Sequence, residues 1–402
     1  MSVQNEAEKR NHRKLGAQLE LFMSMEEAPG MPFFMPKGMI VRNELEKFWK
    51  EEHRKAGYEE IKTPIMMKQE LWEQSGHWQH YHENMYFTDV EDQSYAIKPM
   101  NCPGAVLIYK SKRRSYRELP IRYGELGLVH RHELSGSLSG LLRVRSFTQD
   151  DAHLFVLEEQ VQSELNKVLD LIDVFYSKFG FQYKIELSTR PEKYMGSMDM
   201  WNKAEEDLEK VLQQRNADYQ VNHGDGSFYG PKIDFHLVDA IGRSWQCGTV
   251  QLDFQMPEKF NCEYIGEDNK AHRPIMIHRA IYGSIERFMA ILIEHYEGNF
   301  PMWLAPVQVK VLPISQNHSE YADRVKGILL EKGFRVEIDD RIEKIGFKIR
   351  EAQIGKVPYM MVVGNKESEE GKVSLRNREG KSQFISVSES ISQMMNEDEM
   401  LR

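Results

Sequence analysis

The sequence predicts an α/β protein of two domains, a larger α+β domain with a mostly antiparallel sheet and a smaller α/β domain with a mixed, mostly parallel sheet. The length of 402 residues is enough for two or three domains. Residues 130–155 show strand-like alternation on either side of a Gly/Ser-rich turn, which is typical of an antiparallel hairpin. After residue 306, strand and helix patterns alternate as βαβαβ units, and this order favours parallel pairing.

Composition excludes several classes of protein. No run approaches the eighteen or so apolar residues of a membrane helix, and the first residues lack the apolar stretch of a secretory signal. The three cysteines, Cys102, Cys247 and Cys262, form no CxxC pair, which predicts a cytoplasmic protein, with an organellar matrix as the alternative. The net charge of −9 does not indicate nucleic-acid binding. The basic cluster at 110–117 is more simply a solvated helix end.

The first part of the chain predicts helices that lead into a strand. Residues 8–23 predict a charged helix, and a Pro/Gly/Met-rich loop follows at 26–38. Residues 39–54 predict an amphipathic helix, which feeds a strand that ends at Pro64. The apolar face of this helix carries Val41, Leu45, Phe48 and Trp49.

The predicted hairpin carries several charged side chains. Its return leg alternates Arg143, Val144 and Arg145, which predicts a half-buried strand. Such a hairpin could surround a small polyanion, because guanidinium groups bind phosphate oxygens bidentately. The residues alone leave a surface hairpin with solvated charges equally open, since the chain has no Gly-Lys-Ser phosphate loop.

Helices and short strands are predicted beyond the hairpin. Apolar positions between 161 and 175 mark a long helix that stops at Gly180, and a second helix is expected at 200–213. Residues 228–254 predict short strands with Gly turns. Residues 278–298 predict a helix that buries Ile285, Phe288, Met289 and Leu292.

The pattern changes near residues 301–306, where we expect the domain boundary. The domains are predicted at 1–302 and 303–402. In the second domain, strands are expected at 307–314, 334–339 and 357–364, with helices at 319–333 and 343–355 between them.

Three segments together resemble the signature motifs of class II aminoacyl-tRNA synthetases. They are the helix and strand ending at Pro64, the Arg131-x-Glu133 hairpin, and Gly283-x-x-x-Arg287. Further segments narrow the resemblance to threonyl-tRNA synthetases over nearly the full chain: GHW at 76–78, KPMNCPG at 98–104, TQDDAH at 148–153, STRPEK at 188–193, FYGPK at 228–232, QCGTVQLDF at 246–254 and IHRAIYGS at 277–284. The resemblance implies a catalytic domain of the class II type followed by an anticodon-binding domain.

The resemblance implies one zinc ion per chain, with Cys102, His153 and His278 as ligands. Each residue alone is more often structural, and the spacing is not a finger pattern. Three protein ligands leave the coordination of the metal open to a substrate, as in catalytic zinc sites. In this family the metal takes the amino group and hydroxyl of threonine, so that valine, which lacks the hydroxyl, is rejected.

Other roles follow from the same resemblance. ATP is expected to bind Arg131, Glu133, Arg143, Phe147 and Arg287, with Mg²⁺ shared among the phosphates. L-threonine is expected to contact Met100, Gln149, Asp151, Tyr229, Lys232 and Gln251. Arg131 and Arg287 would be catalytic, and His77 would help to deprotonate the terminal ribose of the tRNA.

The resemblance also implies macromolecular partners. Glu367 and Arg376 match positions that the family uses on anticodon bases, and Lys344, Lys348 and Arg350 could contact phosphates. Ile342 stands where many relatives have asparagine. The face of the 39–54 helix and the strand ending at Pro64 correspond to the two-fold interface of the family, which predicts a homodimer.

The implied activity is ATP-dependent ligation of L-threonine to the 3′ end of tRNA(Thr) through a threonyl-adenylate. Two alternatives are a regulatory paralogue that lost the chemistry and a synthetase that passes threonine to another acceptor, such as a carrier protein. The complete set of site residues favours the enzyme, and the anticodon module disfavours the other acceptor. Bacterial relatives carry further N-terminal domains, including one that hydrolyses mischarged seryl-tRNA. An engineered core and a naturally short form both fit this sequence.

Overall fold

The computed structural model describes residues 3–239 and 241–401. Within these residues no helix is both long and apolar enough to span a membrane. The chain divides into two compact units that interleave along the sequence. One comprises Met1–Met23, Phe33–Leu45 and Leu292–Arg402, and the other comprises Ser24–Pro32 and Glu46–Ile291. The single boundary between residues 302 and 303 stays a prediction.

The unit that contains residues 46–291 is built on an eight-stranded sheet. Its order is β10 (Tyr219–Asn222), β9 (Gln182–Ser188), β11 (Lys232–Val238), β12 (Ser244–Asp253), β15 (Ile275–Ser284), β8 (Ser146–Val156), β7 (Ile121–His130) and β3 (Glu59–Glu60). Only the outermost pairs, β10 with β9 and β3 with β7, are parallel. The prediction of a mostly antiparallel sheet is therefore confirmed.

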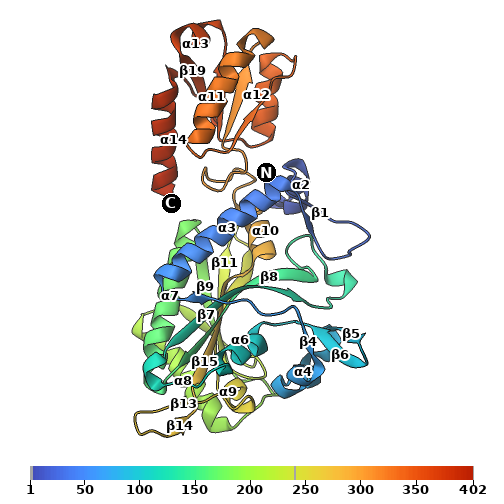
Figure 1. The fold of residues 1–402 in the computed structure, drawn as a ribbon, viewed down its shortest axis with the longest axis vertical. Helices are drawn as coiled ribbons and strands as arrows, with labels where there is room; N and C mark the ends of the chain where they lie inside the picture. Colours follow the sequence, from blue (N-terminus) through green and yellow to red (C-terminus); the bar gives the residue numbers. More distant parts are fainter. Residues whose placement is uncertain (1–2, 240, 402) are drawn as a thin grey trace. The chain divides into compact units, whose positions relative to one another are not determined.

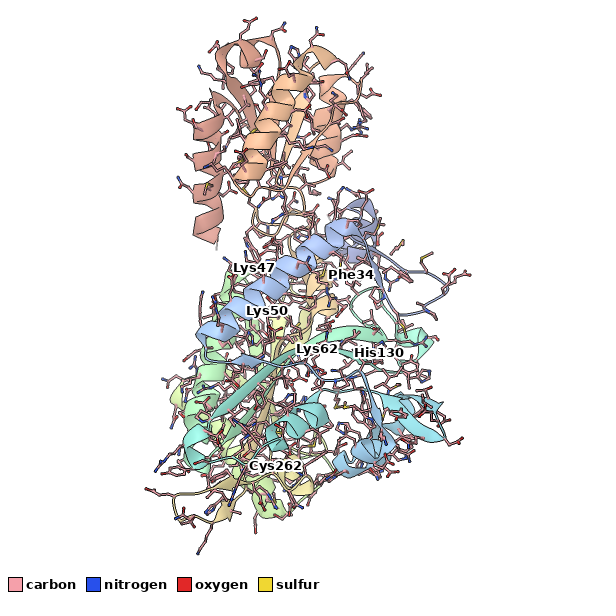
Figure 2. All side chains as sticks on the ribbon, in the orientation of Figure 1. Phe34, Lys47, Lys50, Lys62, His130 and Cys262 are labelled. Atoms are coloured by element: carbon pink, nitrogen blue, oxygen red, sulfur yellow. The ribbon has the colours of Figure 1, made fainter. Side chains whose placement is uncertain are left out.

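The hairpin at the centre of this sheet joins β7 and β8. Their pairing runs from Ile121 opposite Phe155 to His130 opposite Ser146, and His130, labelled in Figure 2, ends β7. Residues 131–145 form the connection. The predicted return strand was wrong for Arg143 and Arg145, because both precede β8. Arg143 lies in the connection, where its backbone forms an isolated β-bridge with Ser139.

Helices cover both faces of the large sheet (Figure 1). On one face, α6 (Cys102–Lys110) and α9 (Gln255–Lys259) pack against Tyr123, Phe155 and Met276. On the other, α7 (Val161–Lys178) donates from the Tyr176 hydroxyl to the carbonyl of Ile281 at 2.8 Å. Because side chains alternate along a strand, the odd-numbered residues of β8 face α6.

The helix α3 (Pro36–Lys55) buries its predicted apolar face within this chain. Val41, Leu45 and Trp49 are at most 1% exposed, and the ring of Phe48 lies 4.9 Å from that of Phe175 in α7. Lys47 and Lys50, labelled on α3 in Figure 2, are exposed. These apolar side chains therefore pack within the subunit. The homodimer stays a prediction.

One predicted helix was wrong at its start. Residues 278–284 belong to β15, and α10 (Ile285–His295) begins after them. A strand buried on both faces gives a continuous apolar run, which periodicity alone does not separate from a buried helix. Gly283 marks the change, with φ of +79° and its missing Cβ placed 2.6 Å from the carbonyl oxygen of Cys247, so that a larger side chain does not fit.

The remaining elements of this unit are shorter or peripheral. The helices α4 (Gln69–Ser75), α5 (His77–Tyr81) and α8 (Met198–Gln214) complete it, with two small sheets formed by β4 (Met66–Lys68), β6 (Gln93–Ile97) and β5 (Tyr86–Val90) and by β13 (Tyr264–Ile265) and β14 (Ala271–His272). The strand predicted before Pro64 is only the two residues of β3.

The other unit contains a mixed five-stranded sheet. Its order is β17 (Val336–Ile338), β16 (Val309–Pro313), β18 (Tyr359–Val363), β19 (Lys372–Asn377) and β20 (Ser382–Ser386). The first three strands are parallel, as the βαβαβ pattern predicts, and β19 and β20 add antiparallel pairs.

Helices cover both faces of this smaller sheet (Figure 1). Met361 of β18 packs with α11 (Ser319–Glu331) and α14 (Val387–Leu401), whereas its neighbour Met360 packs with α12 (Ile345–Ile354). The same unit contains α1 (Val3–Arg10), α2 (His12–Gln18), β1 (Phe22–Met23), β2 (Phe33–Phe34) and α13 (Asn365–Glu370). The helix predicted at 8–23 is therefore two helices, with Asn11 capping the second.

Candidate functional site

Two adjoining cavities open over the face of the large sheet that α6 covers. The first has a volume of about 530 Å³, and the second has a volume of about 270 Å³. They share the lining residues Arg131, Gln149, Gln246, Thr249 and Ala280. The shared wall indicates two neighbouring binding sites whose occupants would meet.

The first cavity is lined by all five residues that the sequence predicts to bind ATP, which are Arg131, Glu133, Arg143, Phe147 and Arg287. The guanidinium carbon of Arg131 lies 5.0 Å from the ring centroid of Phe147. Its Nε donates to the carbonyl of Pro99 at 3.1 Å, which fixes its direction. Arg287 is held in the same way, through Nε to the carbonyl of Leu142 at 3.0 Å.

Arg145, which the sequence does not single out for the site, organises the loop beside this cavity. Its Nε donates to the carbonyl of Glu133 at 2.9 Å, and its Nη2 donates to Oγ of Ser135 at 3.1 Å. Its backbone amide donates to the carbonyl of Gly30 at 2.7 Å. The Pro/Gly/Met-rich segment therefore supports the loop that carries Glu133.

The second cavity is lined by all six residues predicted to bind threonine, which are Met100, Gln149, Asp151, Tyr229, Lys232 and Gln251. The Tyr229 hydroxyl donates to Oε1 of Gln251 at 2.6 Å. Lys232 pairs with Asp234, which the sequence reasoning missed and which also accepts from Gln246 at 2.8 Å. Burial raises the pKa of the Asp151 carboxyl, and the hydrogen bond from Asn101 partly opposes that rise.

The three predicted metal ligands meet at the wall of the second cavity. The ligand atoms of Cys102, His153 and His278 all lie within 4.8 Å of one another, and the three residues are buried. Cys102 begins α6, while His153 and His278 face each other across β8 and β15. Sequence spacing could not reveal this cluster, because the register of two distant strands creates it.

The donor set fits a zinc ion. One thiolate and two imidazoles suit zinc, and three ligands leave a position open for a substrate. Nδ1 of His153 is buried and has no hydrogen-bond partner among the described residues, so a lone pair is available for a metal. Burial lowers the pKa of His153 well below its usual value, which keeps the imidazole neutral, as ligation requires.

His77 lies behind the metal cluster rather than on the lining of either cavity described above. It is 1% exposed, and its Nε2 is 3.1 Å from Sδ of Met100 and 3.9 Å from Sγ of Cys102. Burial lowers its pKa to about 3, so it is a weak base near neutral pH. Its role with the ribose stays a prediction.

The predicted anticodon residues lie on neighbouring elements of the smaller sheet. Glu367 of α13 accepts from the amide of Gly364 at 3.0 Å and from Oγ of Ser374 at 2.7 Å. Nε of Arg376 in β19 is buried without a partner in the described part of the chain. The suggested phosphate contact of Lys348 is wrong, because its buried Nζ donates to the carbonyls of Pro313 and Asp339, each at 2.9 Å. Ile342 is 87% exposed.

Comparisons with known proteins match both units. Residues 85–296 match the tRNA synthetase class II core domain (G, H, P, S and T), and residues 308–397 match an anticodon binding domain. The threonine–tRNA ligase of Carboxydothermus hydrogenoformans is 63% identical over 373 residues, covering 93% of this chain and 59% of the relative. That of Caldanaerobacter subterraneus subsp. tengcongensis is 64% identical over 378 residues, covering 94% and 59%.

A solved structure agrees over nearly its full length. The crystal structure of the RNA binding domain of threonyl-tRNA synthetase from Cryptosporidium parvum Iowa II is 42% identical, with a TM-score of 0.93. The alignment covers 96% of this chain and 98% of that one. The chain thus spans about 59% of the length of the curated relatives quoted above.

Proposed function

The chain belongs to the threonyl-tRNA synthetases of class II, and from this premise we propose that it ligates L-threonine to the 3′ end of tRNA(Thr) through a threonyl-adenylate. ATP with Mg²⁺ would occupy the first cavity and threonine the second. One observation carries the proposal, namely that the two predicted sets of residues line two cavities with a common wall. A nucleotide and an amino acid bound there would have their reacting groups side by side.

The first step would be attack of the threonine carboxylate on the α-phosphorus of ATP, which forms the threonyl-adenylate as the bond to the bridging oxygen breaks and pyrophosphate leaves. Arg131 lines both cavities, so its guanidinium is suited to the α-phosphate, where charge develops. Its fixed direction means that little reorganisation is needed as the reaction proceeds. Arg287 and Arg143 would hold the outer phosphates, Phe147 would stack on adenine, and Glu133 would accept from the adenine amino group.

Zinc would be held by Cys102, His153 and His278, and when bound it would act as a Lewis acid toward both the amino group and the hydroxyl of threonine. Asp151 would bind the amino group, because its carboxylate lines the same cavity. Valine fills the same volume without a hydroxyl. A site built to bind a hydroxyl rejects such an analogue by roughly 10⁴–10⁵, which is the selection that we propose here.

In the second step a hydroxyl of the terminal ribose of the tRNA would attack the carbonyl carbon of the threonyl-adenylate, which forms the threonyl ester and releases AMP. Glu367 and Arg376 would contact anticodon bases, supported by the match of residues 308–397 to an anticodon binding domain. We also propose that the chain forms a homodimer. Its compartment would be a reducing one, the cytoplasm or an organellar matrix, since Cys102, Cys247 and Cys262 are all free. Sedimentation at micromolar concentration that gives only monomer would contradict the dimer.

The deciding experiment combines threonine-dependent exchange of pyrophosphate into ATP with a zinc assay on the purified chain. We expect exchange with threonine, none with valine, and one zinc per chain. Charging of tRNA(Thr) with labelled threonine then tests the second step. Full exchange without charging would favour a different acceptor. Absence of both exchange and charging would favour the regulatory paralogue.

A further inference from the structure

Asp253 is fully buried at the end of β12, and both of its carboxylate oxygens are engaged. Oδ2 lies 2.9 Å from Nε2 of His278. Oδ1 accepts from the backbone amides of Gln255 and Met256 at 2.7 and 2.9 Å. A buried carboxylate is costly unless it is hydrogen-bonded, so these partners explain how the group is accommodated in the core.

The contact with His278 decides which nitrogen of that ring carries the proton. A carboxylate only accepts hydrogen bonds, so Nε2 of a neutral His278 must donate. The lone pair then lies on Nδ1, which becomes the nitrogen available to a metal held with Cys102 and His153. Without Asp253 the ring could adopt either tautomer and rotate about its side-chain torsions.

The other oxygen of the same carboxylate accepts hydrogen bonds from the first two backbone amides of α9. That helix ends at Lys259, whose Nζ lies 3.4 Å from the carbonyl of Ser75. Oγ of Ser75 is 2.8 Å from Nδ1 of His77, and the opposite nitrogen of His77 approaches Cys102. A chain of contacts thus leads from Asp253 through α9 to the surroundings of a second metal ligand.

We propose that Asp253 is a positioning residue for the metal site. One oxygen fixes the tautomer and orientation of His278, and the other anchors α9 behind the cluster. The inference rests on the proposed zinc site, and it adds to that proposal a residue that acts through His278 without touching a substrate. Outer partners of this kind typically contribute 10- to 100-fold to metal affinity.

The first test measures zinc affinity rather than catalysis. We expect Asp253→Asn to raise the zinc dissociation constant 10- to 100-fold, as determined by competition with a chromogenic chelator. An unchanged dissociation constant in folded Asp253→Asn would overturn the inference.

Asp239 offers a matched control in the turn between β11 and β12. It is also buried, and its Oδ1 accepts from the amides of Ile241 and Arg243. Its Oδ2 accepts from the indole of Trp245 at 3.0 Å and from Nε of Arg243 at 2.7 Å. Asp239→Asn therefore removes a similar charge and similar bonds, and we expect its zinc affinity to equal that of the wild type. An equal loss in both variants would show a general effect of buried carboxylates and would contradict the inference.

A measurement on the unaltered chain covers the case in which Asp253→Asn does not fold. Long-range ¹⁵N–¹H correlation spectra of the zinc-loaded wild type should show the proton of His278 on Nε2. A proton on Nδ1 would overturn the inference. Absence of zinc from the wild type would instead overturn the proposed metal site, so the two failures are distinguishable.

Discussion

Nε of Arg143 donates a hydrogen bond to Oε2 of Glu133 at 2.9 Å, so that two residues proposed to bind ATP are paired with each other. The Arg143 side chain is 52% exposed. An ion pair open to solvent in this way contributes only about 0–1 kcal/mol. If ATP binds as proposed, it would exchange this pair for its own contacts at little cost, with Glu133 accepting from the adenine amino group and Arg143 binding the phosphates.

The role of Glu133 predicts base selectivity. Glu133→Gln should lower the preference for ATP over GTP about tenfold, because a carboxylate accepts from the adenine amino group and repels the guanine carbonyl, whereas an amide can donate to that carbonyl. Pyrophosphate exchange with each nucleotide gives the ratio of kcat/KM. The KM for threonine is the internal control and should stay the same. A preserved ATP preference would show that Glu133 does not contact the base.

Loss of any one metal ligand should abolish zinc binding. Cys102→Ser, His153→Ala and His278→Ala each leave two ligands, too few to hold zinc against a competing chelator. Elemental analysis after gel filtration should find less than a tenth of a zinc per chain, and threonine activation should be lost in parallel. Cys262→Ser removes a buried cysteine that is outside the cluster and should retain full zinc content. Zinc retained by all three ligand variants would place the metal elsewhere.

Selection through a hydroxyl predicts weak discrimination against serine. Serine keeps the hydroxyl and lacks one methyl group, which is worth about 1–3 kcal/mol, or 10- to 200-fold. The ratio of kcat/KM for threonine over serine in pyrophosphate exchange should therefore fall in that range. Valine measured in parallel should show a far larger ratio. A threonine preference above roughly 10⁴ would reveal a contact to the methyl group that hydrophobic packing does not explain.

The proposed anticodon contact of Arg376 predicts an effect confined to tRNA. Arg376→Ala should weaken tRNA(Thr) binding by about 1–3 kcal/mol if the guanidinium reads a base, because its buried Nε has no partner in the described structure that would be lost. The KM for tRNA in aminoacylation measures this, and pyrophosphate exchange without tRNA should be unchanged. Arg350→Ala, at an exposed position of α12, is the comparison for a phosphate contact, with a smaller loss that disappears at high salt.

The buried Asp150 predicts a pH dependence of stability. Burial raises its pKa to about 6, although Arg279 and the amides of Ile281 and Tyr282 oppose the rise. The folded chain therefore retains a proton that the unfolded chain, with a pKa of about 3.9, releases. The free energy of unfolding should fall by about 2 kcal/mol as pH rises from 4 to 7, and this component should be absent in Asp150→Asn. Urea unfolding of both proteins at several pH values gives the difference, and parallel curves would contradict it.

The antiparallel hairpin and the βαβαβ pattern could be predicted because each depends on neighbouring residues. The Gly/Ser turn and the apolar alternation are local signals, and they located β8, β16 and α11, whereas β7 lies almost entirely before the predicted hairpin, which began at His130. Residues 278–284 were misread as helix, because a strand buried on both faces lacks alternation. Asp253 gave no signal, since its importance comes from lying diagonally across from His278 on the adjacent strand. The roles of the site residues came from resemblance to a family, and periodicity would not have supplied them.

The strand β8 sets the spacing between the residues that contact the ligands proposed here. Phe147 and Gln149 line the first cavity, and Gln149, Asp151 and His153 line the second. Along the strand these residues therefore follow the same order as their proposed contacts, from the adenine base to the side chain of threonine. At about 3.4 Å per residue, Phe147 and His153 stand about 20 Å apart. Deleting one residue between them would turn His153 to the opposite face of the sheet. The strand therefore admits changes of side chain but not of spacing.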